Sequence, residues 1–111
     1  MNIERIEENG VTILAFDGRL DANTVALVDQ AFATALAYGS RNFVWDFAKL
    51  DYVSSAGLRS VLQALKQVGA RGGKFAICCL SRNVLEVFDI SGFKSLITIC
   101  PDRARAVAAA V

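Results

Sequence analysis

The sequence predicts an α/β domain whose sheet is mixed but mainly parallel, with roughly four or five strands and about four helices. Three observations support this prediction. An Asn9-Gly10 dipeptide, which favours the positive φ angles of a tight hairpin turn, follows a short stretch near the N-terminus. Beyond it, segments with the apolar spacing of helices alternate with short apolar runs typical of strands. Finally, the 111 residues contain no linker, so residues 1–111 are expected to form one domain.

The first part of the chain is expected to form a hairpin followed by a helix. The apolar run at residues 11–16 is typical of a strand that pairs, across the Asn9-Gly10 turn, with the stretch before it. Residues 17–21 predict a loop. Apolar residues then recur at helical spacing from residue 23 to residue 37, and Gly39 ends this predicted helix.

A strand, a helix and another strand follow. The bulky run at residues 43–47 is typical of an interior strand. An amphipathic helix comes next, and its apolar face carries Leu58, Val61, Leu62, Leu65 and Val68. Residues 75–80 are almost wholly apolar, as in a parallel strand that is covered on both faces.

The last part of the chain predicts a short helix, a strand and a C-terminal helix. Either Ser81 or Asn83 can cap the short helix. Residues 96–99 are mainly apolar and are expected to form the last strand. Pro101 suits the start of a helix, so the alanine-rich residues 102–111 are expected to be helical.

The composition and charge of the chain exclude several function classes. The 12 basic and 11 acidic residues give a net charge of +1 and form no basic run, so no nucleic-acid partner is expected. No apolar run approaches the ~18 residues of a membrane span, and the N-terminal stretch lacks the pattern of a signal peptide. We therefore expect a cytoplasmic protein without direct membrane insertion.

The sequence predicts neither a metal site nor an enzyme active site. It has no histidine, and Cys78, Cys79 and Cys100 lack the C-x-x-C spacing. Because neighbouring side chains on a strand point to opposite faces, Cys78 and Cys79 are expected not to bond each other, and all three thiols to be reduced and buried. Arg71-Gly-Gly-Lys74 lacks the spacing of a P-loop. We therefore expect no cofactor and no catalytic residue.

The most informative feature is a Ser54-Ser55 pair at the start of the second predicted helix. The first turn of a helix has unpaired backbone N–H groups and a partial positive charge, so it can accommodate an added phosphate. The simpler interpretation is that one serine caps the helix. Gly57, just downstream, is expected to leave room for the close approach of another protein's backbone.

The stretch around these serines resembles the STAS domain of bacterial anti-sigma factor antagonists, also called anti-anti-sigma factors. The resemblance rests on Asp46, Tyr52-Val53, Ser55, Gly57 and Leu58 in register, on Gly18-Arg-Leu-Asp21, and on the segment from Val84 to Phe93. It spans nearly the whole chain and implies that Ser55 is the phosphate acceptor, with Ser54 standing where these proteins usually have an acidic residue. It also implies a partner-binding surface made of Asp21, Ser54, Ala56, Gly57, Leu58 and Arg59.

Two aspartates near this stretch each keep two interpretations. Asp21 can be an acceptor at the start of a helix, whereas the resemblance implies that it positions the acceptor loop or a kinase-bound nucleotide. Asp46 matches the strand-end aspartate of the family, and it can also serve structurally by accepting hydrogen bonds from loop N–H groups. Asp51 is expected to face solvent.

The resemblance implies a partner-switching regulator rather than an enzyme. When unphosphorylated, it would bind an anti-sigma factor that is a serine kinase of the histidine-kinase-like ATPase type. Phosphorylation of Ser55 would end that complex, and a metal-dependent, PP2C-like phosphatase would reset it. The alternative is a constitutive STAS subunit or scaffold of a larger complex, such as a lipid-transport ABC system.

Overall fold

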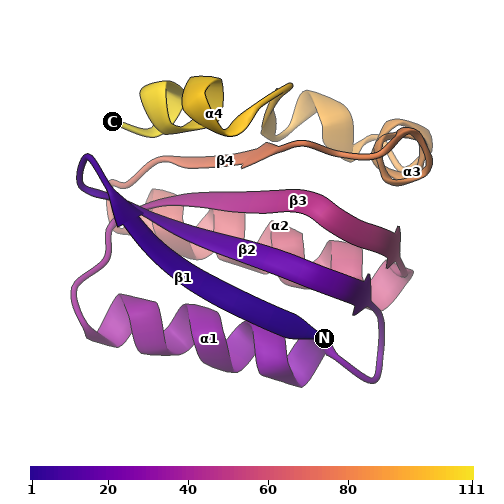
Figure 1. Cartoon of the computed structure of the whole chain (residues 1–111), viewed down its shortest axis with the longest axis horizontal. Helices are drawn as coiled ribbons and strands as arrows, with labels where there is room; N and C mark the ends of the chain where they lie inside the picture. Colours follow the sequence, from indigo (N-terminus) through magenta and orange to yellow (C-terminus); the bar gives the residue numbers. More distant parts are fainter.

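The computed structural model describes residues 1–111 as one five-stranded sheet with helices on both faces (Figure 1). The strands are β1 (Asn2–Glu8), β2 (Val11–Leu20), β3 (Asn42–Val53), β4 (Phe75–Cys78) and β5 (Thr98–Cys100). The helices are α1 (Val25–Ala37), α2 (Ser55–Ala70), α3 (Arg82–Ile90) and α4 (Arg103–Ala110), with a 3₁₀ turn η1 (Phe93–Ser95). The strands follow one another in sequence order across the sheet; β1 is antiparallel to β2 and the other pairs are parallel. The predicted fold class is confirmed.

The helices divide between the two faces of the sheet. The larger hydrophobic core lies on one face, where α1, α2 and α3 cover aromatic side chains such as Phe16, Trp45 and Phe47. A smaller core lies on the other face, where Ala106, Val107 and Ala110 of α4 cover the outer side chains of the strands. The nearly continuous apolar runs of β3 and β4 follow from this covering of both faces.

The Asn9-Gly10 turn and the helix starts show local sequence determining local structure. Asn9 and Gly10 have φ angles of 54° and 78°, as the predicted hairpin turn requires. Ser81, rather than Asn83, caps α3, because its Oγ accepts a hydrogen bond from the Val84 N–H at 3.3 Å. Asp102 caps α4 by accepting from the Arg105 N–H at 2.8 Å.

Strands β2 and β3 are longer than predicted. The sequence predicted a loop at residues 17–21 and ended the next strand at residue 47, but parallel pairing continues to Leu20 and Val53. The ladder passes two register shifts, between Ala15 and Asp17 and between Gly18 and Arg19. At such bulges a strand contains glycine and charged residues and loses its regular alternation. The strand cannot then be predicted from the spacing of its apolar residues. The paired ends of β2 and β3 therefore project beyond β4, which ends at Cys78.

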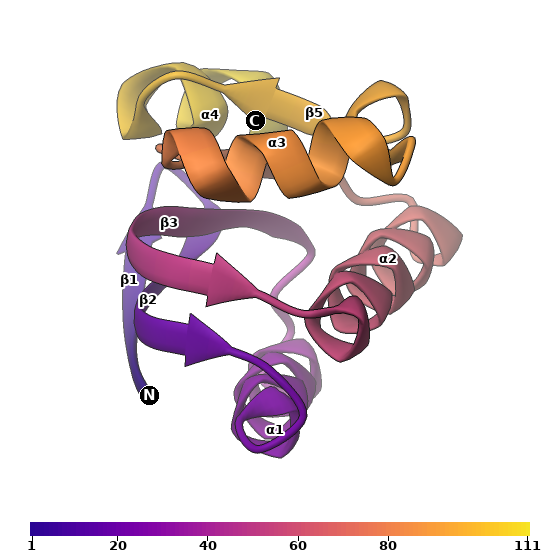
Figure 2. The ribbon, with the colours of Figure 1, turned by 90° about the vertical axis from the view of Figure 1, so that its right-hand side faces the viewer.

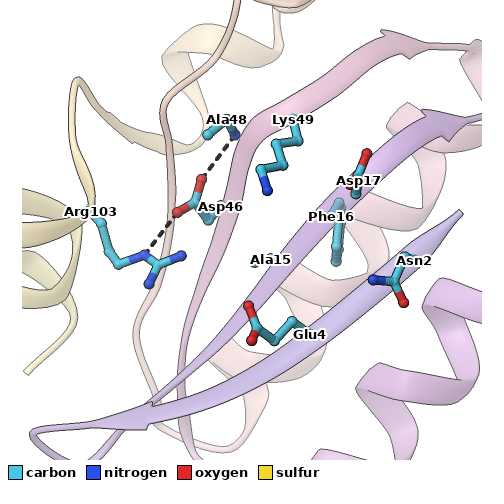
Figure 3. Close-up of a pocket in the computed structure, with 9 residues that line it drawn as sticks. All are labelled: Asn2, Glu4, Ala15, Phe16, Asp17, Asp46, Ala48, Lys49 and Arg103. Atoms are coloured by element: carbon cyan, nitrogen blue, oxygen red, sulfur yellow. Dashed lines mark hydrogen bonds and ion pairs between the residues drawn. The ribbon is translucent and has the colours of Figure 1, made fainter.

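Asp46 was predicted to lie at a strand end. It lies instead in the middle of β3, because β3 continues to Val53. Its Oδ1 accepts a hydrogen bond from the Ala48 N–H at 2.9 Å, and its Oδ2 lies 2.9 Å from Nε of Arg103 on α4 (Figure 3). Asp46 is 5% exposed. The ion pair therefore ties α4 to β3 beside a pocket of about 130 Å³ on the outer face of the sheet.

We expect Arg103→Met to lower the free energy of unfolding by about 2 kcal/mol, because it leaves the buried Asp46 carboxylate without its charged partner. Arg105→Met is the matched control on the same helix. Its ion pair with Asp102 is 3.7 Å long and joins two exposed side chains, so the change should stay within about 0.5 kcal/mol. Urea unfolding followed by the fluorescence of Trp45, the single tryptophan, measures both values. Equal losses in the two variants would contradict a special role for the Asp46 pair.

Candidate functional site

The candidate site lies where the projecting ends of β2 and β3 lead into α1 and α2 (Figure 2). Leu20 pairs with Val53 at the end of the parallel ladder, and the Ser54 N–H donates to the Leu20 carbonyl oxygen at 2.9 Å. The residues that follow the two strands, Asp21 and Ser54-Ser55, are therefore brought together from different parts of the chain. The carboxyl ends of parallel strands are the usual position of binding sites in open α/β sheets.

The two adjacent serines have different environments. Ser54 is the N-cap of α2, with extended backbone angles, and its Oγ accepts a hydrogen bond from the Gly57 N–H at 3.2 Å. Ser55 is the first residue of α2, is exposed, and takes part in none of the side-chain hydrogen bonds of the chain. Ser54 is therefore the serine that caps the helix, and the hydroxyl of Ser55 is accessible.

Asp21 is fixed by contacts within its own turn. Its Oδ1 accepts from the Asn23 N–H at 2.9 Å, which closes an Asx turn before α1, and its Oδ2 lies 3.6 Å from Nε of Arg19. Thr24, the N-cap of α1, also contacts Asp21, because its Oγ1 accepts a hydrogen bond from the Asp21 N–H at 3.0 Å. The interpretation of Asp21 as an acceptor at a helix start is therefore confirmed.

Arg19 belongs to this edge of the sheet although sequence reasoning did not single it out. Its guanidinium lies 4.2 Å from the centroid of the Tyr52 ring on the paired strand, within the range of a cation–π contact. The ladder places Arg19 opposite Tyr52. This pairing depends on the two bulges, which the sequence does not reveal. The only sequence signal for Arg19 was its position inside the Gly18-Arg-Leu-Asp21 stretch.

Gly57 and Leu58, which were expected in a partner-binding surface, are buried inside the chain. A Cβ atom at Gly57 would lie 2.8 Å from both Cγ and the backbone oxygen of Leu20, and 2.9 Å from Cγ2 of Val53. The glycine is therefore required by the close packing of α2 on the ends of β2 and β3, not by the approach of a partner. This corrects the sequence interpretation of both residues.

The accessible part of the predicted surface consists of Ser55, the half-buried Asp21, Ser54 and Ala56, and Arg59 one turn along α2. The first turn of α2 contains no acidic side chain. A negative charge on Ser55 would thus meet the positive end of the α2 dipole and the cationic side chain at the i+4 position. Asp51 is exposed, as expected.

The three cysteines are free thiols, but their placement departs from the sequence prediction. Only Cys78 is buried, whereas Cys79 and Cys100 are half-buried. Burial raises the pKa of the Cys78 thiol, and the Asp46 carboxylate raises it further. Burial also raises the pKa of the Cys79 thiol. Since the thiolate is the reactive form, neither cysteine is activated as a nucleophile.

Comparison with known proteins identifies the family of this chain. The family model of the STAS domain matches residues 2–106. The chain belongs to the STAS domain family. The candidate anti-sigma factor antagonist BtrV of Bordetella bronchiseptica is 37% identical over 101 residues, covering 91% of this chain and 87% of BtrV. The anti-sigma F factor antagonist of Paenibacillus polymyxa is 26% identical over 108 residues, covering 96% of this chain and 92% of that protein.

Solved structures show that this STAS domain shares its fold with anti-sigma factor antagonists. A candidate antagonist from Thermotoga maritima superposes with a TM-score of 0.90 at 19% identity, over 96% of this chain and 92% of that one. The phosphorylated form of the Bacillus cell fate determinant SpoIIAA superposes with a TM-score of 0.73 at 20% identity, over 96% and 97% of the two chains. None of the helices of this STAS domain has both the length and the apolar composition needed to cross a membrane.

Proposed function

We propose that this STAS domain is an anti-sigma factor antagonist whose binding is switched by phosphorylation of Ser55. Unphosphorylated, it binds an anti-sigma factor that is a serine kinase of the histidine-kinase-like ATPase type. The observation that carries the proposal is that the two serines have different roles. Ser54 caps α2, and the exposed Ser55 hydroxyl remains free. The names of BtrV and the Paenibacillus relative support the antagonist role.

The physical basis of the switch is a charge added at Ser55. The free domain tolerates this charge, whereas an interface with a bound partner does not. A phosphoserine carries about −1.5 to −2 charges at neutral pH. Within the free protein, the N-terminal end of α2 accommodates this charge, so the fold persists. Against a closely packed partner, the same phosphate loses its water, and Arg59 compensates for only part of that loss, so the contact is costly. The added charge therefore weakens the complex without unfolding the domain.

The remaining parts of the cycle are those that the resemblance to anti-sigma factor antagonists implies. A PP2C-like, metal-dependent phosphatase restores the Ser55 hydroxyl and with it the binding-competent form. The kinase, the phosphatase and the STAS domain act together in the cytoplasm, where ATP is available. The partner-binding surface comprises the accessible side chains around Ser55, namely Asp21, Ser54, Ala56 and Arg59.

Phosphate incorporation tests the assignment of the acceptor. The STAS domain is incubated with ATP and the anti-sigma kinase that it captures from a lysate of its source organism, and phosphorylated residues are located by mass spectrometry. Ser55→Ala should abolish incorporation. Ser54→Ala should retain it while lowering the free energy of unfolding by about 1 kcal/mol, because the helix cap is lost.

Three results would overturn the proposal. Phosphate on Ser54, or undiminished incorporation into Ser55→Ala, would assign the switch to another residue. Capture of a transporter ATPase instead of a kinase, with no dependence on ATP, would favour the alternative of a permanent subunit. In that case Ser55 would be an interface residue without a regulatory role.

A further inference from the structure

We propose that Asp46, Cys78 and Cys79 form a binding site for a thiophilic divalent cation of the Zn²⁺ or Cd²⁺ type. The three side chains come from the middle of β3 and from the end of β4, on the face of the sheet covered by α4. The inference is independent of the proposed function, because Asp46 is mid-strand in β3 and neither cysteine belongs to the Ser55 surface. The sequence predicted no metal site, because it has no histidine and no C-x-x-C spacing, and it also predicted that the Cys78 and Cys79 thiols point to opposite faces of a strand.

The backbone of Cys79 overturns that expectation. Cys79 has a φ angle of 62°, a left-handed conformation that is uncommon for residues other than glycine. Strand β4 has ended one residue earlier, at Cys78, and the Cys79 N–H donates to the Cys100 carbonyl oxygen at 3.3 Å. The two sulfur atoms lie within 4.8 Å of each other; Cys78 belongs to the smaller core beneath α4, and Cys79 packs against it. Non-glycine residues held in this conformation cluster at functional sites.

The distances suit a shared ion. The two Sγ atoms and one Asp46 carboxylate oxygen all lie within 4.8 Å of one another. Zn–S bonds of about 2.3 Å with tetrahedral angles place two sulfur ligands roughly 3.8 Å apart. The side chains therefore need to close by at most about 1 Å to reach this spacing, which small χ1 adjustments provide. A water molecule would supply the fourth ligand.

The donor set and the local charge also favour this class of ion. Thiolate ligands select zinc and softer ions over Mg²⁺ or Ca²⁺, and a carboxylate completes mixed sites. Each thiol releases its proton to solvent as the ion binds. Two thiolates, the Asp46 carboxylate, the divalent ion and the paired Arg103 guanidinium then carry no net charge, so the filled site is neutral although largely buried. Cys79 is half-buried and gives the ion a path from solvent.

Titration with Cd²⁺ tests the inference directly. The reduced protein should bind one equivalent, seen by native mass spectrometry and by the ultraviolet absorption of Cd²⁺–thiolate bonds. Cys79→Ser should lower the affinity at least about 100-fold, because losing even an outer partner of a metal ligand costs 10–100-fold. Cys100→Ser is the matched control: it removes the thiol of the adjacent strand, outside the cluster, and should bind Cd²⁺ as the wild type does.

Three outcomes would overturn the inference. The first is the absence of thiolate absorption with one equivalent of Cd²⁺, and the second is equal affinity in wild type and Cys79→Ser. The third is loss of binding in Cys100→Ser, which would point to the pair formed by Cys78 and Cys100 across β4 and β5. The fluorescence of Trp45, buried on the other face, reports whether each variant is folded.

Discussion

Ser55→Asp is expected to weaken binding of the anti-sigma factor about 100-fold, or roughly 2.8 kcal/mol. The side chain at this position is exposed at the first residue of α2, where partner contact would cover it. A carboxylate buried there without a matched cation costs several kcal/mol, part of which Arg59 at the i+4 position offsets. Isothermal titration of the purified anti-sigma factor with each variant gives the affinities.

Ser55→Asn is the matched control for this prediction, because asparagine has the size of aspartate without its charge. It should bind within about 3-fold of the wild type, which corresponds to less than 1 kcal/mol. Equal losses in the aspartate and asparagine variants would show that bulk, not charge, disrupts the interface. Equal affinities in all three proteins would place Ser55 outside the interface.

Gly57→Ala is expected to lower the free energy of unfolding by about 2–3 kcal/mol. The added methyl group would lie 2.8 Å from the backbone oxygen of Leu20, and a backbone atom at the end of β2 cannot move aside without breaking the strand ladder. Overpacking of this kind typically costs 1–3 kcal/mol, and relief would require the first turn of α2 to shift. Urea unfolding followed by Trp45 fluorescence measures the effect.

Gly69→Ala lies on the same helix and should have the opposite sign. A Cβ atom there meets nothing within 4 Å, so only the helix propensity changes, which favours alanine by about 0.8–1 kcal/mol. A stabilised Gly69→Ala beside a destabilised Gly57→Ala would show that close packing, rather than flexibility, explains the glycine near the serines. A neutral Gly57→Ala would contradict the packing argument.

Much of this fold follows from local sequence signals. The Asn9-Gly10 turn adopts the predicted backbone angles, and the amphipathic pattern from Leu58 to Val68 places α2 on the sheet as expected. The order of strands and helices was also predicted correctly, because the longer elements carry their own periodicity and the short strands lie within apolar runs.

The features that were missed depend on contacts between distant segments. The extensions of β2 and β3 arise from parallel pairing across bulges, so Arg19 and Tyr52 meet although neither carries a local signal of contact. The burial of Gly57 follows from the approach of Leu20, and the pairing of Asp46 with Arg103 joins residues from β3 and α4. The closeness of the Cys78 and Cys79 sulfur atoms accompanies the positive φ angle of Cys79, which no local sequence signal predicts.

The most direct test of the proposed switch uses the phosphate itself. The affinity of the anti-sigma factor is measured by isothermal titration for the unmodified STAS domain, for the domain phosphorylated at Ser55, and for the latter after phosphatase treatment. The proposed switch requires a loss of affinity of at least about 100-fold on phosphorylation and full recovery on dephosphorylation. Equal affinity for the phosphorylated and unmodified forms would contradict it.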